Sequence, residues 1–308
     1  MQTIYYRKQG DPELKIISKP VEGCWINIED AKKEDLQTIS NITGLEYIDI
    51  DDSIDRFEIP RFEKQDSYTI VFVRNPAIGD ESQFTEILTV VFSDKYLITI
   101  SPDKNSTISY LLENARQRLV TTQETKLFIS ILLNIAQQFT YEVKQVRNVV
   151  LKGKKPIEKI DTEDFVQLAQ SEEILNQYLA SLVPLNNVIE AIGSSKYIKF
   201  HEEERELLED LQITLRQSAD VCKVSVNSIV STRDSYQVIF TNNLNKIIKL
   251  LTSFTIILTV PTIIASIFGM NVRLPLSPDS AFSFPIILII IAVVSVCVLF
   301  IFNLKRWL

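Results

Sequence analysis

The residues best suited to chemistry in this chain are hydroxyl side chains inside an apolar stretch near its end. The stretch from Leu250 to Met270 contains no charged residue, and a helix of that length, at about 1.5 Å per residue, crosses a hydrocarbon core of roughly 30 Å. Its hydroxyls recur at alternating spacings of 3 and 4, at Thr252, Thr255, Thr259, Thr262 and Ser266. This spacing places them on one helix face, as in a water-accessible pore wall. The alternative is hydroxyls that serve helix packing or bond back to their own helix.

A second uncharged stretch, residues 285–304, follows after a short loop and carries few polar side chains. Two spans per chain cannot enclose a pore, so a pore needs several copies around a rotation axis. The second span is then the outer, lipid-facing helix. Lys246 and Lys249 precede the first span, and Lys305 and Arg306 follow the second. By the positive-inside rule both termini are expected in the cytoplasm and the loop outside.

The loop between the spans opens with Gly269-Met270-Asn271. In an oligomer, Asn271 would form a ring of carboxamides at the outer mouth. Because no acidic side chain lies in the span, an ion there would meet neutral oxygens. That suits a strongly hydrated cation such as Mg²⁺, which gives up its waters reluctantly and can be held through them.

The first 100 residues are typical of a mixed α and β domain, and β-runs stop near Ser106. Runs of β-forming residues lie at Cys24–Ile28, Tyr47–Ile50, Tyr68–Val73, Ile87–Phe92 and Tyr96–Ile100. Two long amphipathic helices are expected over 121–151 and 161–192. A single helix is expected from Glu202 to about Phe268, a range with no glycine and one proline, Pro261.

The long helix carries apolar or small residues at alternating spacings of 3 and 4. They are Leu208, Leu211, Leu215, Ser218, Cys222, Ser225, Ile229, Thr232, Tyr236 and Ile239. The pattern allows either a weak coiled-coil seam or a face packed on the chain's own domain. The acidic run 202–204 is interpreted as a solvated face.

Composition excludes several classes of function. The formal net charge is −7, and basic residues predominate only near the spans, so the soluble part is acidic and argues against nucleic-acid binding. Cys24, Cys222 and Cys297 are scattered and show neither a disulfide framework nor metal-ligand spacing. His201 is the only histidine, which excludes a histidine-based zinc site within one chain. No nucleophile–base pair or phosphate loop is visible, so an enzyme is not expected.

The tripeptide, the preceding helix 242–268, the two C-terminal spans and the basic end Lys305-Arg306-Trp307 together resemble the CorA family of divalent-cation transporters. Weaker similarity lies in residues 24–27 and 87–100. The resemblance implies a homopentamer in the plasma membrane, with an α+β cytosolic domain of αβα type, a long stalk helix that lines the pore, and an outer ring of second spans. Its partners would be copies of itself and membrane lipid.

This resemblance divides the chain into four parts. They are a cytosolic αβα domain at 1–120, a cytosolic helical hairpin at 121–200, a stalk helix at 201–249, and a pore domain at 250–308 with spans at 250–270 and 285–304 and an outer loop at 271–284.

The resemblance also implies roles for individual residues. Gly269, Met270 and Asn271 would form the selectivity filter. The pore-lining positions would be Asn245, Ile248, Leu251, Thr255, Thr259, Thr262 and Ser266, most of which belong to the face found from spacing. Ile248 and Leu251 would form a hydrophobic constriction able to gate by dewetting. Regulatory Mg²⁺ bound between neighbouring subunits would shut the pore. The stalk acids that would bind it, located by their offset along the sequence, are Asp210 and Asp234.

The outer loop departs from the family pattern. Its sequence VRLPLSPDSAFSF lacks the Met-Pro-Glu-Leu ending of the best-described magnesium transporters, with Arg273 near the mouth and Asp279 as its only acid. Mg²⁺ uptake is the first hypothesis, with Co²⁺ or Ni²⁺ as further ions. The alternatives are a Zn²⁺, Ni²⁺ or Co²⁺ transporter or exporter of the same fold, and a non-conducting membrane scaffold or sensor.

Overall fold

The computed structural model describes residues 2–65, 67–77, 84–93, 95–114, 116, 119–152, 161–194, 198, 200–270, 272, 282–305 and 307. The chain divides into two compact units. The first contains Met1–Lys155 and Asp161–Ser231, and the second contains Pro156–Ile160 and Thr232–Leu308.

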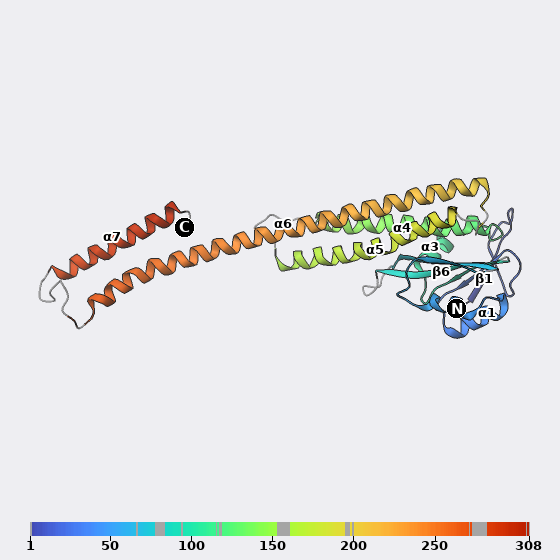
Figure 1. Cartoon of the computed structure of the whole chain (residues 1–308), viewed down its shortest axis with the longest axis horizontal. Coiled ribbons are helices and arrows are strands. Elements are labelled where there is room, and N and C mark those ends of the chain that lie inside the picture. The colour runs from blue at the N-terminus through green and yellow to red at the C-terminus, as the bar shows by residue number, and fades with distance from the viewer. Residues whose placement is uncertain are drawn as a thin grey trace. The chain divides into compact units, whose positions relative to one another are not determined.

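The first unit contains a seven-stranded sheet in its described part, in the order β2-β1-β3-β7-β6-β5-β4 (Figure 1). The strands are β1 Gln2–Tyr6, β2 Lys15–Ile17, β3 Cys24–Ile28, β4 Arg61–Lys64, β5 Tyr68–Pro76, β6 Thr85–Ser93 and β7 Tyr96–Ile100. β3 and β7 are parallel, with Trp25 opposite Leu97, and the other neighbours are antiparallel.

Helices cover both faces of this sheet (Figure 1). Helix α1 (Lys33–Thr43) contributes Leu36 and Ile39 to the buried cluster on one face. Helices α3 (Ser106–Asn114) and α4 (Glu124–Lys152) lie on the other, where the ring of Phe128 packs edge-on against Phe92 at 4.7 Å between centroids. The central strands are buried on both faces, and their β-branched and aromatic runs fit that setting. The expected αβα layering is confirmed.

Residues 47–50 form a short helix, α2 (Tyr47–Ile50), followed by the 3-10 turn η1 (Asp51–Ile54). The predicted strand there is wrong. The Tyr68 hydroxyl accepts a hydrogen bond from the Glu46 backbone N–H at 3.1 Å and donates to Asp49 Oδ2 at 2.6 Å. These long-range bonds hold the segment in a turn despite its β-forming residues.

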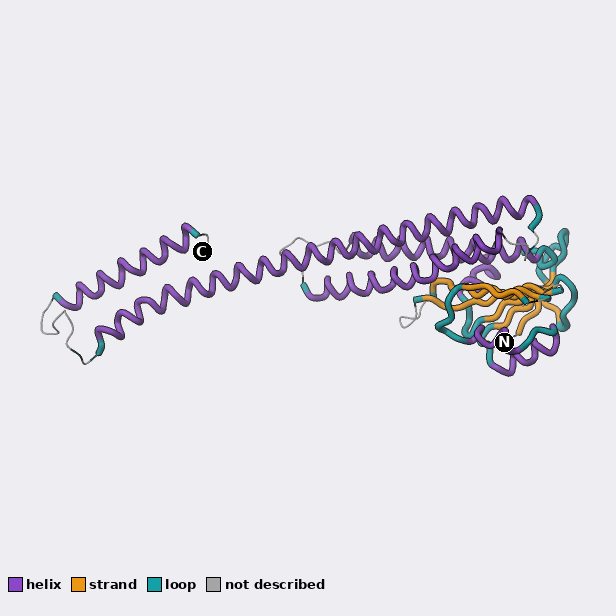
Figure 2. Tube along the Cα trace, viewed as in Figure 1, coloured by secondary structure: helices purple, strands orange, loops and turns teal. Residues whose placement is uncertain are grey.

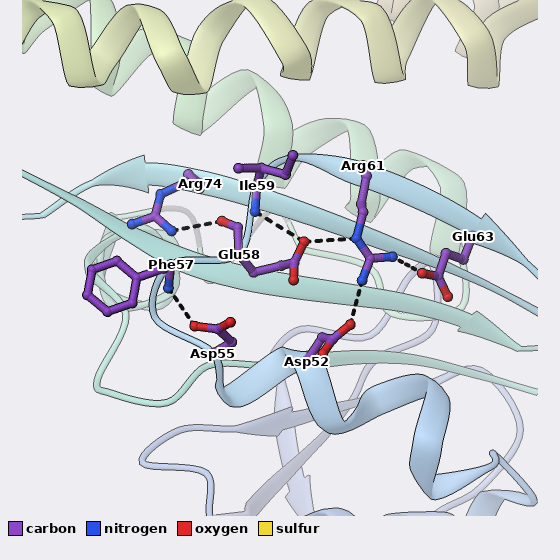
Figure 3. A network of polar contacts seen from close by, with 8 residues as sticks. All are labelled: Asp52, Asp55, Phe57, Glu58, Ile59, Arg61, Glu63 and Arg74. Atoms are coloured by element: carbon purple, nitrogen blue, oxygen red, sulfur yellow. Dashed lines mark hydrogen bonds and ion pairs between the residues drawn. The ribbon is translucent and has the colours of Figure 1, made fainter.

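The edge strand β4 is joined to the preceding segment by Arg61 (Figure 3). Its guanidinium lies 2.7 Å from Asp52 Oδ2 and 2.8 Å from Glu58 Oε1, and it also contacts Glu63. Arg74 of β5 donates to the carbonyl oxygens of Arg56 and Glu58. These bonds fasten residues 52–58 to the sheet, and the charges on β4 disfavour pairing with a further strand.

The remaining helices are α5 (Thr162–Ser194), α6 (Glu202–Phe268) and α7 (Ser283–Leu304). The three long predicted helices correspond to α4, α5 and α6, and α6 has the predicted bounds. In the first unit, the seam on α6 is buried from Leu208 to Ile229. There the Thr140 and Ser218 hydroxyl oxygens lie 2.6 Å apart, and the Cys222 thiol donates to the Leu175 carbonyl. Since these partners belong to α4 and α5, this part of the seam packs on the chain's own domain.

Candidate functional site

The predicted pore helix is the last part of α6. Within the described residues, α6 and α7 are the two helices long and apolar enough to cross a membrane. Helix α6 continues through Pro261 and ends at Phe268. The N–H of the next residue, Gly269, donates to the carbonyl oxygens of Ala265 at 2.9 Å and Ser266 at 3.2 Å. The hydroxyl residues are therefore on one continuous helix, as their spacing requires.

All the predicted pore-lining side chains are exposed in the single chain. They are Asn245, Ile248, Leu251, Thr255, Thr259, Thr262 and Ser266, and Thr252 of the hydroxyl face is exposed as well. The apolar residues Ile248 and Leu251 have exposed fractions of 50% and 65%. A single chain thus leaves this face uncovered.

Helix α7 runs beside the last part of α6 (Figure 2). It covers a face of α6 that differs from the hydroxyl face. From Leu250 to the end of α6, the shielded residues are Ser253, Ile256, Ile257, Val260, Pro261, Ile264 and Phe268. At about 100° per residue, the centre of this set lies roughly 160° around the helix from the centre of the hydroxyl face. The hydroxyl face and the α7 contact are on opposite sides of one helix.

Three of the exposed hydroxyls donate to their own helix. The Thr255, Thr259 and Thr262 Oγ1 atoms donate to the carbonyls of Leu251, Thr255 and Leu258 at 2.9, 2.7 and 2.8 Å. Each hydroxyl proton is used by the backbone, so its oxygen lone pairs are what remains for solvent or an ion. The sequence left two alternatives for these hydroxyls, bonding to their own helix or forming a polar pore wall. The two are compatible, because a hydroxyl that donates to its own helix can still expose its oxygen.

The predicted filter tripeptide is described only in part. Gly269 and Met270 directly follow the end of α6, and Met270 is 56% exposed. Asn271, Arg273 and Asp279 lie outside the described residues. A Cβ added at Gly269 would come no closer than 3.4 Å to a neighbouring atom, the Ala265 carbonyl oxygen. One chain alone therefore leaves room for a side chain at Gly269.

The two predicted regulatory acids are both exposed. Asp210 belongs to the first unit and Asp234 to the second. The carboxylate of Asp234 lies 3.7 Å from Arg233 Nε. Within the described part of the chain, no group of three His, Cys, Asp or Glu side chains could hold a metal ion.

The sequence suggested that the acidic run 202–204 is a solvated face, but the three side chains are not all exposed to solvent. Glu203 is exposed and pairs with Lys126 Nζ at 3.0 Å, which lowers the pKa of its carboxyl. Glu204 is only 3% exposed, because it accepts hydrogen bonds from Thr125 Oγ1 and from the His201 backbone N–H. These bonds join the starts of α4 and α6. A cavity of about 710 Å³ lies beside them, but both carboxylates are already paired.

The chain is similar to known proteins in both sequence and structure. Residues 22–306 match the family described as CorA-like Mg²⁺ transporter protein. The cobalt/magnesium transport protein CorA of Methanocaldococcus jannaschii is 25% identical over 315 residues, which cover 96% of this chain and 95% of that protein. The magnesium transport protein CorA of Campylobacter jejuni is 26% identical over 115 residues, 36% of this chain and 35% of that protein.

Solved structures show the same fold. The complete structure of the CorA magnesium transporter from M. jannaschii superposes with a TM-score of 0.81 at 22% identity, covering 100% of this chain and 99% of that one. Full-length CmaX gives 0.76 at 15% identity, covering 99% and 97%. The cytoplasmic domain of ZntB from Vibrio parahaemolyticus gives 0.64 at 9% identity, covering 76% and 96%.

Proposed function

Because this chain belongs to the family of CorA-like Mg²⁺ transporters, we propose that it forms a passive, channel-like route for Mg²⁺ uptake across the plasma membrane. The observation that carries this proposal is the exposed hydroxyl face of α6 on the side away from α7. A neutral wall of oxygen atoms suits a cation that keeps its water shell.

The channel is a homopentamer with both termini of each chain in the cytoplasm. Each chain contributes its hydroxyl face to a central pore, and α7 lies outside. The membrane potential drives uptake: a divalent ion that crosses 100 mV, inside negative, gains about 4.6 kcal/mol, twice the single-charge value. The exposure of the whole face in one chain supports this arrangement, since a pore wall must be left free by its own chain.

The proposed filter is a ring formed by Gly269, Met270 and Asn271, with the Asn271 carboxamides at the outer mouth. Ile248 and Leu251 form a hydrophobic constriction below the threonines, and Asn245 forms a second carboxamide ring at the cytoplasmic end. This order places polar rings on both sides of an apolar segment that can close by losing its water.

Asp210 and Asp234 are proposed to sense cytosolic Mg²⁺ between neighbouring subunits, where bound ions hold the stalks together and the pore shut. Their exposure in one chain leaves their carboxylates available to another copy. A variant with Asp210 and Asp234 replaced by Asn should then keep conducting at cytosolic Mg²⁺ concentrations that close the unaltered channel.

The direct test is Asn271→Ala in the full-length protein reconstituted into liposomes. Loss of the carboxamide ring should reduce Mg²⁺ uptake to the level of empty liposomes, while the oligomer stays intact. Asn303→Ala is the matched control, since Asn303 is an exposed asparagine at the other end of α7, and it should conduct normally. Undiminished uptake by Asn271→Ala would refute the filter assignment.

Cobalt is a second candidate cargo, because the relative from M. jannaschii is named a cobalt/magnesium transport protein. In the same liposomes, Co²⁺ should compete with Mg²⁺ for uptake, and Ni²⁺ is expected to behave similarly. If Mg²⁺ fails to compete with Zn²⁺, Ni²⁺ or Co²⁺, a transporter or exporter of those ions is the better description. If no cation crosses even when internal Mg²⁺ is removed, the protein is a membrane scaffold or sensor.

A further inference from the structure

Two lysines of α6 extend the face that contacts α7. Lys249 and Lys246 precede the buried residue Ser253 by 4 and 7 positions, which is one and two helical turns. At about 100° per residue, both lie within roughly 60° of the centre of the α7 contact and on the side away from the hydroxyl face. Both side chains are exposed.

The C-terminal end of α7 adds a third lysine to the same end of the helix pair. Helix α7 ends at Leu304 and is capped by Lys305, whose N–H donates to the Ile301 carbonyl at 3.0 Å. Because α7 runs back along α6 (Figure 2), its C-terminal end lies at the Lys246–Lys249 end of the pair. Lys246, Lys249 and Lys305 are called the basic cluster below.

The basic cluster has no neutralising partner in the described part of its unit. Asp234 is the only acid described there, and it lies 12 residues before Lys246, about 18 Å along the helix. Its carboxylate is also close to Arg233. Like charges held together at the edge of a membrane are unfavourable unless an anionic group lies between them.

An aromatic side chain marks the level of the bilayer at which the cluster lies. Trp307 stacks on Phe302 with the ring planes 3° apart and the centroids at 5.6 Å, and the backbone N–H of Trp307 donates to the Phe302 carbonyl at 3.0 Å. A tryptophan at the end of a membrane span belongs to the headgroup region. The cluster is therefore at the depth of lipid phosphates.

We propose that Lys246, Lys249 and Lys305, with Trp307 beside them, bind the headgroup of an anionic phospholipid. Charge complementarity and the depth given by Trp307 select this occupant over a soluble anion. The lipid would lie in the angle between α6 and the end of α7, where its phosphate offsets the repulsion among the lysines and its acyl chains continue along the apolar surface of both helices.

Tryptophan fluorescence gives a site-specific test with the full-length protein. The chain has two tryptophans, and Trp25 is fully buried in the sheet domain with its Nε1–H bonded to Thr99. Emission lost in Trp307→Phe therefore reports Trp307. In nanodiscs of phosphatidylcholine, brominated phosphatidylglycerol should quench this emission at about tenfold lower mole fraction than brominated phosphatidylcholine, since basic residues at the membrane surface attract anionic headgroups.

The variant with Lys246, Lys249 and Lys305 all changed to Gln should lose that preference. The control carries the same change at Lys33, Lys104 and Lys223, which are exposed lysines of the first unit, and should keep it. Trp25 emission verifies folding in both. Equal quenching by the two lipids in the unaltered protein, or a preference that survives in the first variant, would overturn the proposal. Inorganic phosphate that abolishes the preference would identify a soluble-anion site instead and overturn it as well.

Discussion

At the scale of single residues, the proposed pore would use the neutral threonines of α6 to favour a cation. The waters around a cation point their hydrogens outward, so a wall that only accepts hydrogen bonds complements them. Thr255, Thr259 and Thr262 present such a wall because their own protons are bound to backbone carbonyls.

The corresponding prediction uses Thr259→Val, which keeps the shape of the side chain and removes its lone pairs. Mg²⁺ flux into liposomes should fall about tenfold, since five lost hydrogen-bond acceptors in a ring raise the barrier by more than one net bond. Ser253→Ala is the matched control, because Ser253 also donates to its helix, at 2.8 Å to the Lys249 carbonyl, but is buried on the α7 side. Equal fluxes in the two variants would contradict the acceptor wall.

A carboxylate in the first unit gives a prediction about how stability depends on pH. Glu86 Oε1 accepts hydrogen bonds from Asn75 Nδ2, the Ser106 N–H and the Ser106 hydroxyl, each at 2.7 Å. Burial nevertheless raises the pKa of Glu86 above its ordinary value of 4.5. The folded chain then holds this proton more tightly than the unfolded chain, so the associated stability is present at low pH and is lost as pH rises through the raised pKa.

Glu86→Gln should flatten this part of the pH dependence, because Gln keeps the accepting oxygen and carries no charge. The measurement is the midpoint of thermal unfolding from about pH 4 to pH 7. Glu113→Gln is the control at an exposed acid of α3. If the unaltered protein and Glu86→Gln change in parallel over this range, Glu86 does not ionise there.

At the scale of elements, two glycines with the same backbone angle separate strain from steric fit. Gly23, before β3, and Gly44, at the end of α1, both have φ of +78°. A Cβ at Gly23 would lie 2.9 Å from Thr122 Cγ2, whereas nothing lies within 4 Å of one at Gly44. Thr122 lies two residues before the start of α4, so Gly23 is where the segments before the strand and the helix approach closely.

Gly44→Ala should therefore lower the free energy of unfolding by about 1–2 kcal/mol, the left-handed strain alone. Gly23→Ala should lower it further, because Thr122 and the backbone beside it must also move. Chemical denaturation of the two variants side by side measures the difference. Equal losses would mean that the contact between Gly23 and Thr122 relaxes freely.

Elements whose signal is local were predicted from the sequence, and elements that depend on distant partners were not. The long helices follow from periodicity and from the lack of glycine, and both signals are properties of neighbouring residues. Strands β1, β2 and β4 lie towards the edges of the sheet and were missed, since they are short and show little alternation. Residues 47–50 have strand-forming side chains but are held in a turn by Tyr68, which is far away in sequence.

At the scale of the whole molecule, the same distinction applies to the candidate site. Spacing alone identified the hydroxyl face, because its positions repeat with the helix. The position of α7 on the opposite side, and the burial of Glu204 by Thr125, arise from packing between helices that no local pattern records. The roles of Asp210 and Asp234 depend on neighbouring copies and stay predictions.

The oligomer itself is open to a direct measurement. The proposed pore requires copies of α6 around an axis, and the proposed number is five. Native mass spectrometry of the purified full-length protein, whose chain mass is 35.3 kDa, should show a complex of five chains. A dimer or a tetramer as the largest species would contradict the proposed pore.

The back-bonded threonines also bear on how the protein is made. In the proposed assembly, a newly inserted chain lies alone in the bilayer, with its future pore wall against lipid tails. A ring of carboxylates would make that stage unfavourable, since an ionised group in hydrocarbon costs several kcal/mol. A hydroxyl whose proton is already bound within its own helix is far better tolerated there. The proposed pore wall can therefore remain in lipid until other copies bind. The absence of charge that is proposed to favour a hydrated cation would also allow assembly from single inserted chains.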